Sequence, residues 1–228
     1  MQCKVNMKML ILLIFLLITA CSVSPDEQSI LDKSSCALPC WNGITPGQTT
    51  EAEFLEILQN LPIIDTDTIK HQMTSQGNIF DKEIFFSFRQ GWTLSQRPKL
   101  GGEVSIIENT VSSFIICGEI NTSMDRLVEQ VGEPEHIISG NNFYGGRLVI
   151  LINAEKGVKY SYTTELDKLE LTPETQIDCI ETFDPLISEE MLEAGYFSNG
   201  DYNAEQTLSA WYPWEGFGNL DEKYPPRH

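Results

Sequence analysis

Residues 50–58, which read TEAEFLEIL, have the pattern of a short amphipathic helix. Thr50 suits the position before a helix, and Glu53, three residues later, completes the sequence pattern of a capping box. Three apolar residues then recur at the spacing of one helix face: Phe54, Leu55 and Leu58. Because Pro62 ends the segment, the sequence predicts a helix that buries a single face.

The same pattern returns further along the chain. Ser123 suits the position before a second helix, Gly132 and Pro134 end it, and the apolar stripe repeats at the same offsets: Leu127, Val128 and Val131. Each helix is followed by a matching strand, because residues 82–88 (KEIFFSF) and 156–162 (KGVKYSY) alternate apolar with polar side chains.

We therefore expect an α+β fold of two tandem units, each a helix followed by antiparallel strands. Neither unit has enough apolar residues for a large core alone, so the two sheets should join or pack. The first unit spans residues 36–119 and the second spans 120–183. The expected strands are 69–73, 79–88, 104–108 and 111–117, then 136–139, 147–153, 158–163 and 176–181.

The N-terminal segment, residues 1–20, has the features of a signal peptide. Lys4 and Lys8 precede an unbroken apolar run from Met9 to Ile18. A helix of that length spans about 15 Å, half of a hydrocarbon core roughly 30 Å thick. The run is therefore too short for a stable membrane span and typical of a secretion signal.

The end of this segment, Ile18-Thr19-Ala20-Cys21, resembles the lipobox of bacterial lipoproteins. The resemblance implies cleavage between Ala20 and Cys21 and acyl chains on Cys21, which anchor a protein durably. The chain would then face the extracytoplasmic side of the cell membrane or outer membrane. The alternative is an ordinary secretion signal followed by a chance cysteine. Residues 21–35 are polar and without a period, which predicts a flexible tether.

Four further cysteines remain in the exported chain: Cys36, Cys40, Cys117 and Cys179. An even number of cysteines in an exported protein favours disulfides, and a local bridge between Cys36 and Cys40 is the economical choice. A metal or redox site is the alternative. The three histidines are not near a cysteine pair, and the Cys-x3-Cys spacing departs from the Cys-x2-Cys redox motif.

The composition limits the possible functions. The formal net charge of −18 repels phosphate backbones, so nucleic acid is not an expected partner. The sequence has no nucleophile motif, phosphate-binding glycine-rich loop or His-Glu-x-x-His motif. The carboxylates of residues 165–174 are interpreted as a solvated surface. We therefore expect no catalytic residues, no cofactor and no metal.

Residues 184–228 form a C-terminal extension that follows the second unit. A short helix is expected from Leu186 to Ala194, with Gly195 as its stop. The candidate interaction surface is a group of four aromatic residues: Trp211, Tyr212, Trp214 and Phe217. Aromatic residues at this density form either a strap over exposed sheet or a recognition surface. The strap is the interpretation that we favour.

Two motifs carry a resemblance to known families. Residues 43–50 (GITPGQTT) before the first helix, and Gly132-Glu133-Pro134 after the second, are similar to BamE/SmpA-like envelope lipoproteins. Tandem helix-then-sheet units also resemble the architecture of the beta-lactamase inhibitor protein. The motif Pro39-Cys40-Trp41-Asn42-Gly43-Ile44 resembles uncharacterised bacterial lipoproteins. BamE-like modules are usually single, so a role in outer-membrane assembly is only an analogy.

Together these observations predict a membrane-anchored, extracytoplasmic module that binds or scaffolds other proteins of the cell envelope without catalysis. The alternative is a tethered small-ligand-binding or inhibitor-type module. A hydrolase with an unrecognised site is the third hypothesis. The expected partners are the membrane, through lipid on Cys21, and an envelope protein.

Overall fold

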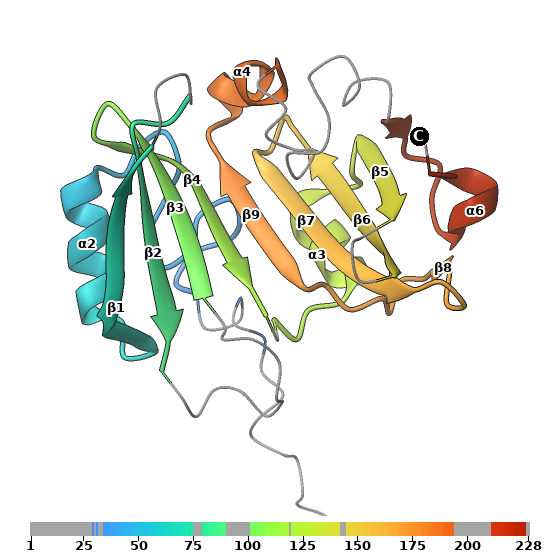
Figure 1. The fold of residues 1–228 in the computed structure, drawn as a ribbon, viewed down its shortest axis with the longest axis horizontal. Helices are drawn as coiled ribbons and strands as arrows, with labels where there is room; N and C mark the ends of the chain where they lie inside the picture. Colours follow the sequence, from blue (N-terminus) through green and yellow to red (C-terminus); the bar gives the residue numbers. More distant parts are fainter. Residues whose placement is uncertain are drawn as a thin grey trace, which may run out of the picture.

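The computed structural model describes residues 29, 31, 34–74, 79–89, 101–118, 120–141, 145–193 and 211–226. The predicted signal peptide, its cleavage site at Ala20 and Cys21, and most of the predicted tether lie outside these residues. A nine-stranded antiparallel sheet dominates the described part of the chain, accompanied by short helices and a two-stranded sheet (Figure 1). Among the described helices, none has the length and apolar character needed to cross a membrane.

The two predicted amphipathic helices are both present. Helix α2 (Glu51–Asn60) begins with the expected capping box, in which the Thr50 hydroxyl accepts from the Glu53 amide and the Glu53 carboxylate accepts from the Thr50 amide. Helix α3 (Met124–Val131) ends at Gly132, which adopts a φ of +87°. Both helices bury their apolar side chains in the same core, on one face of the sheet (Figure 1).

Each helix precedes antiparallel strands of the main sheet. The strands after α2 are β1 (Ile64–Met73), β2 (Lys82–Phe88), β3 (Gly101–Ile107) and β4 (Thr110–Cys117). Those after α3 are β5 (His136–Asn141), β6 (Gly146–Asn153), β7 (Val158–Glu165), β8 (Glu170–Leu171) and β9 (Cys179–Phe183). The strand order is β1-β2-β3-β4-β9-β7-β6-β5-β10, so β4 and β9 join the two halves into one sheet.

Several expected boundaries need correction. We expected an α+β fold of two tandem units, but the described part of the chain is mostly β, with few short helices and one continuous main sheet that is not clearly divided into two units. Strand β1 starts at Ile64 and not at residue 69, since Ile64 is fully buried and pairs with Phe88. Strand β9, which was expected from residue 176, begins at Cys179, and Gln176 makes only an isolated bridge to Ser123. Residues 185–193 form a 3-10 turn and the short helix α4 (Ser188–Glu193) in place of one helix.

The main core lies between the sheet and helices α2 and α3. Trp41 and Phe86 both stack with Phe114, with ring centroids 5.1 Å and 6.0 Å from the Phe114 ring. A smaller core lies on the opposite sheet face, because Ile138, Ile150 and Ile152 alternate in β5 and β6 with residues of the main core. Helix α4 places the buried Met191 in this second core.

The predicted disulfides are confirmed as Cys36–Cys40 and Cys117–Cys179. Their partners are 4 and 62 residues apart in sequence. The chain-entropy model gives about 2 kcal/mol of stabilisation for the first bridge and about 4 kcal/mol for the second. Structural disulfides form and persist in oxidising compartments, which indicates an extracytoplasmic location.

Several residues from the predicted tether, among them Ser29, Leu31 and Ser34, belong to the folded part of the molecule. The Ser29 hydroxyl is fully buried and contacts the Thr122 hydroxyl. Leu31 is 9% exposed and packs in the main core, as an aliphatic side chain is expected to do. The folded part of the chain therefore extends upstream of Cys36.

Candidate functional site

The predicted aromatic surface near the C-terminus is a strap on the sheet. Strand β10 (Tyr212–Pro213) pairs with β5, and β11 (Gly218–Asn219) pairs with β8. The four candidate residues are all partly buried. Tyr212, Trp214 and Phe217 pack against the main core, and Trp211 packs against the second core. This packing is what a strap over the sheet requires. A role of these residues in recognition stays a prediction.

Tyr224, which the sequence interpretation did not single out, holds the strap together. Its side chain is fully buried and stacks on Trp214 at a ring-centroid distance of 6.1 Å. The Tyr224 hydroxyl accepts from the Glu215 amide at 2.8 Å and donates to the Gly216 carbonyl at 2.8 Å. The buried Arg147 donates to the Asp221 carboxylate at 2.8 Å and so ties the short helix α6 (Leu220–Lys223) to β6. These contacts fix the strap through polar groups as well as aromatic packing.

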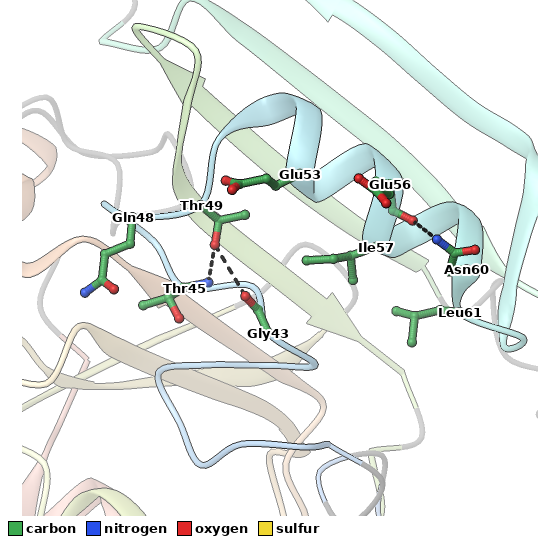
Figure 2. A pocket seen from close by; sticks show the side chains of 9 residues that line it. All are labelled: Gly43, Thr45, Gln48, Thr49, Glu53, Glu56, Ile57, Asn60 and Leu61. Carbon is green, nitrogen blue, oxygen red and sulfur yellow. Dashed lines mark hydrogen bonds between the residues drawn. The ribbon is translucent and has the colours of Figure 1, made fainter.

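A groove of about 540 Å³ lies between α2 and the loop before it (Figure 2). The groove is lined by Gly43, Thr45, Gln48, Thr49, Glu53, Glu56, Ile57, Asn60 and Leu61. Figure 2 shows the Thr49 hydroxyl between two groups of the loop: it accepts from the Thr45 amide at 2.8 Å and donates to the Gly43 carbonyl at 3.5 Å. The lining is therefore mostly polar, with two aliphatic side chains and two carboxylates.

The Pro-Cys-Trp-Asn-Gly-Ile motif builds the loop side of this groove. Trp41 and Ile44 are buried in the main core and bond to each other through their backbones. Gly43 lies between them with a φ of +88°, a conformation that glycine adopts without strain. The motif thus has a clear structural role in anchoring residues 41–44 beneath α2.

The two described histidines lie in different surroundings. His71 is about half exposed, with its Nδ1 atom 3.9 Å from the Glu51 carboxylate. His136 packs edge-on against Trp211 with ring centroids 5.1 Å apart. Within the described residues, no group of three or more His, Cys, Asp or Glu side chains could hold a metal ion.

A different group of residues gathers on the sheet face opposite α2 and α3, here called the outer face. Paired residues of neighbouring antiparallel strands share a face. The strand register therefore places one line of side chains across five strands, in the order Phe85, Glu103, Ile115, Glu181 and Lys159. Lys70 of β1 precedes Phe85 in the same line.

The carboxylates in this line have different surroundings. Glu181 is 1% exposed and forms an ion pair with Lys159. Glu103 is partly buried and has no ion pair or hydrogen bond to the described part of the chain. Burial raises the pKa of Glu103 above its ordinary value, and the negative charges of Glu83 and Glu181 add to this effect, while Lys159 opposes it. Glu103 is therefore a carboxylate that has no directly bonded partner in the described part of the chain and is only partly compensated, by the charge of Lys159.

We call Glu83, Phe85, Glu103 and Ile115 the Glu103 patch. All four side chains are partly exposed. The sequence interpretation missed the patch because Glu103 is one of many acidic residues in the chain. The available signal was the alternation in residues 101–107, where Val104 and Ile106 face the core and Glu103 must face the other way.

Comparison with known proteins identifies no relative: no family model, no curated protein and no solved structure matches this chain.

The raised pKa of Glu103 predicts how the free energy of unfolding depends on pH. A carboxyl whose pKa is raised by folding stabilises the fold at low pH, and this contribution is lost as the pH rises through the folded-state pKa. Replacing Glu103→Gln should therefore raise the urea midpoint of unfolding near neutral pH and leave it unchanged well below pH 4.5. Glu129→Gln, an exposed change on α3, is the matched control. Equal midpoints for Glu103→Gln and the unsubstituted chain near neutral pH would contradict the assignment.

Proposed function

We propose that this protein is a lipid-anchored, non-catalytic binding module of the cell envelope that docks a partner protein on its outer sheet face. The observation that carries the proposal is the Glu103 patch, where Phe85 and Ile115 are partly exposed beside a carboxylate that has no partner within the described residues. Aromatic side chains are enriched at protein interfaces, and a partly exposed aromatic ring next to an aliphatic side chain gives a partner apolar surface to bury.

The anchoring part of the proposal rests on the sequence and on the disulfides. The segment Ile18-Thr19-Ala20-Cys21 follows a signal-peptide pattern, and the disulfide Cys117–Cys179 is consistent with export. An anchor of several acyl chains keeps a module at the membrane surface and raises its effective concentration near other envelope proteins. A docking role therefore fits the proposed location.

Two tandem units are also part of the proposal. They are supported by the repeated order of one helix followed by antiparallel strands, and by the central pairing of β4 with β9, the last strand of each half. Kinship with BamE/SmpA-like envelope lipoproteins is proposed on the residues 43–50 motif, which leads into the capped helix α2.

The groove beside α2 favours a second candidate function, a tethered module that binds a small ligand. A volume of about 540 Å³ lies within the range of ligand sites. Ile57 and Leu61 supply apolar contact, and Glu53 and Glu56 would favour a ligand with a positive charge. The groove has no aromatic side chain among its lining residues, so the outer face is the stronger candidate.

The anchor is tested by replacing Cys21→Ala in the full chain. Without the thiol no lipid can be attached, so the chain should no longer incorporate a labelled fatty acid and should accumulate as an uncleaved precursor. Fatty-acid labelling and a mobility assay on the same cells measure both effects. Ser22→Ala, next to the lipidation site, is the control and should be labelled and cleaved like the unsubstituted chain. Unchanged labelling of the Cys21→Ala chain would contradict the lipid anchor.

Docking on the outer face is tested by photo-crosslinking in intact cells. A photoreactive residue at Ser87, which lies on the outer face of β2, should capture a distinct partner protein. The same residue at Glu129, exposed on α3, should not capture that protein. Equal capture from both positions, or capture only from Glu129, would overturn the proposed docking face.

A further inference from the structure

We propose that the Glu103 patch binds the guanidinium group of an arginine side chain on the partner protein. This inference rests on the proposed function, because it names the group that the outer face recognises. It goes further by assigning the recognition to one carboxylate, one aromatic ring and one aliphatic neighbour on adjacent strands: Glu103, Phe85 and Ile115.

The strand register places an apolar neighbour on each side of Glu103. Phe85 and Ile115 lie directly opposite Glu103 on its two neighbouring strands. Directly paired residues have Cβ atoms about 5 Å apart, so both are neighbours of Glu103 on the outer face. Glu83 lies on the same face one row away, on the strand that carries Phe85. The patch therefore presents two carboxylates beside one ring.

A second feature of the same face indicates a missing polar partner. Ser105 lies two residues beyond Glu103 on β3, directly opposite Glu83. Its side chain is fully buried, and its hydroxyl has no hydrogen-bond partner in the described part of the chain. A buried hydroxyl without a partner costs stability. The row next to Glu103 thus contains an unsatisfied polar group as well as a carboxylate without an ion pair in that part of the chain.

Within the described residues, no cation forms an ion pair with Glu83 or Glu103. Lys159 is the nearest cation along the line towards β7, and it is paired with the buried Glu181. Lys70 lies two strands from Glu103, about 10 Å away by strand spacing, and its side chain is exposed. Two carboxylates, Glu83 and Glu103, therefore remain for a cation supplied from outside.

The chemistry of the Glu103 patch favours arginine over other cations. A guanidinium donates two parallel hydrogen bonds to a carboxylate and stacks its plane on an aromatic face. Phe85 offers such a face beside Glu103, which adds a cation–π contact of about 1 kcal/mol or more where water is excluded. A lysine ammonium would gain the charge interaction but neither the bidentate geometry nor the planar stacking.

The test uses the full chain in detergent and a short fluorescent peptide of three arginines, with the same peptide carrying citrulline as an uncharged control. Arginine peptide binding should weaken about tenfold in Glu103→Gln, a change typical for loss of one charged hydrogen-bond pair. The variant Glu129→Gln removes the same charge from α3 and should weaken binding less than about twofold, as expected for a distant screened charge. Phe85→Leu should reduce the preference for arginine over a three-lysine peptide.

The outcomes separate this inference from the proposed function. Equal weakening by Glu103→Gln and Glu129→Gln would show that the peptide senses only net charge and would overturn the arginine site. A second outcome is that crosslinking from Ser87 captures a partner, while Glu103→Gln changes neither that capture nor the binding of the arginine peptide. In that case the proposed docking face is supported and the arginine site is wrong. Loss of binding through unfolding is excluded by a urea midpoint that is at least as high as that of the unsubstituted chain.

Discussion

The pairing of β4 with β9 is the interaction on which the rest of the structure depends. Five residue pairs, from Ser113 with Phe183 to Cys117 with Cys179, join the strands that end the two halves of the chain. The disulfide covalently links the last of these pairs. Without this junction each half would expose a sheet edge in the middle of the molecule, and an unpaired edge is open to non-native pairing. With it, both helices share one core.

The same junction determines what lies on the outer face. It brings Ile115 of β4 beside Glu181 of β9, and Glu181 beside Lys159 of β7. A buried ion pair at the centre of the sheet pays a desolvation cost that its own attraction only partly offsets. The neighbouring Glu103 is less buried and has no ion pair within the described part of the chain. This arrangement is the basis on which we propose the outer face as a docking surface.

The two edges of the main sheet are protected from non-native pairing in different ways. The edge at β5 is covered by β10, and the buried Tyr224 and the Arg147–Asp221 ion pair hold this strap in place. The edge at β1 has a register shift between Asp65 and Lys70, and its last residues are exposed and polar. Irregular register and charge are common protections for an edge strand. The outer face, rather than an edge, is therefore the surface on which we propose that a partner docks.

Local patterns predicted the elements that depend on nearby residues. The capping box at Thr50 and Glu53, the stripe of α3 and the local disulfide Cys36–Cys40 are all encoded within a few positions of the sequence. The extent of β1 and the position of β9 were wrong, because they depend on pairing with distant strands. The setting of Glu103 was missed for the same reason: its neighbours Phe85 and Ile115 come from other strands, and its burial follows only from the assembled sheet.

The most direct measurement is native-state hydrogen exchange on the full chain. If β4 and β9 form the central junction, the amides that bond across it, those of Phe114, Ile116 and Ile180, should exchange only through global unfolding. Amides in β2 and β6 should then exchange with the same limiting free energy, because both halves unfold as one unit. Independent exchange of the two halves, or rapid exchange in β4 and β9, would contradict the single joined sheet on which the proposed outer face depends.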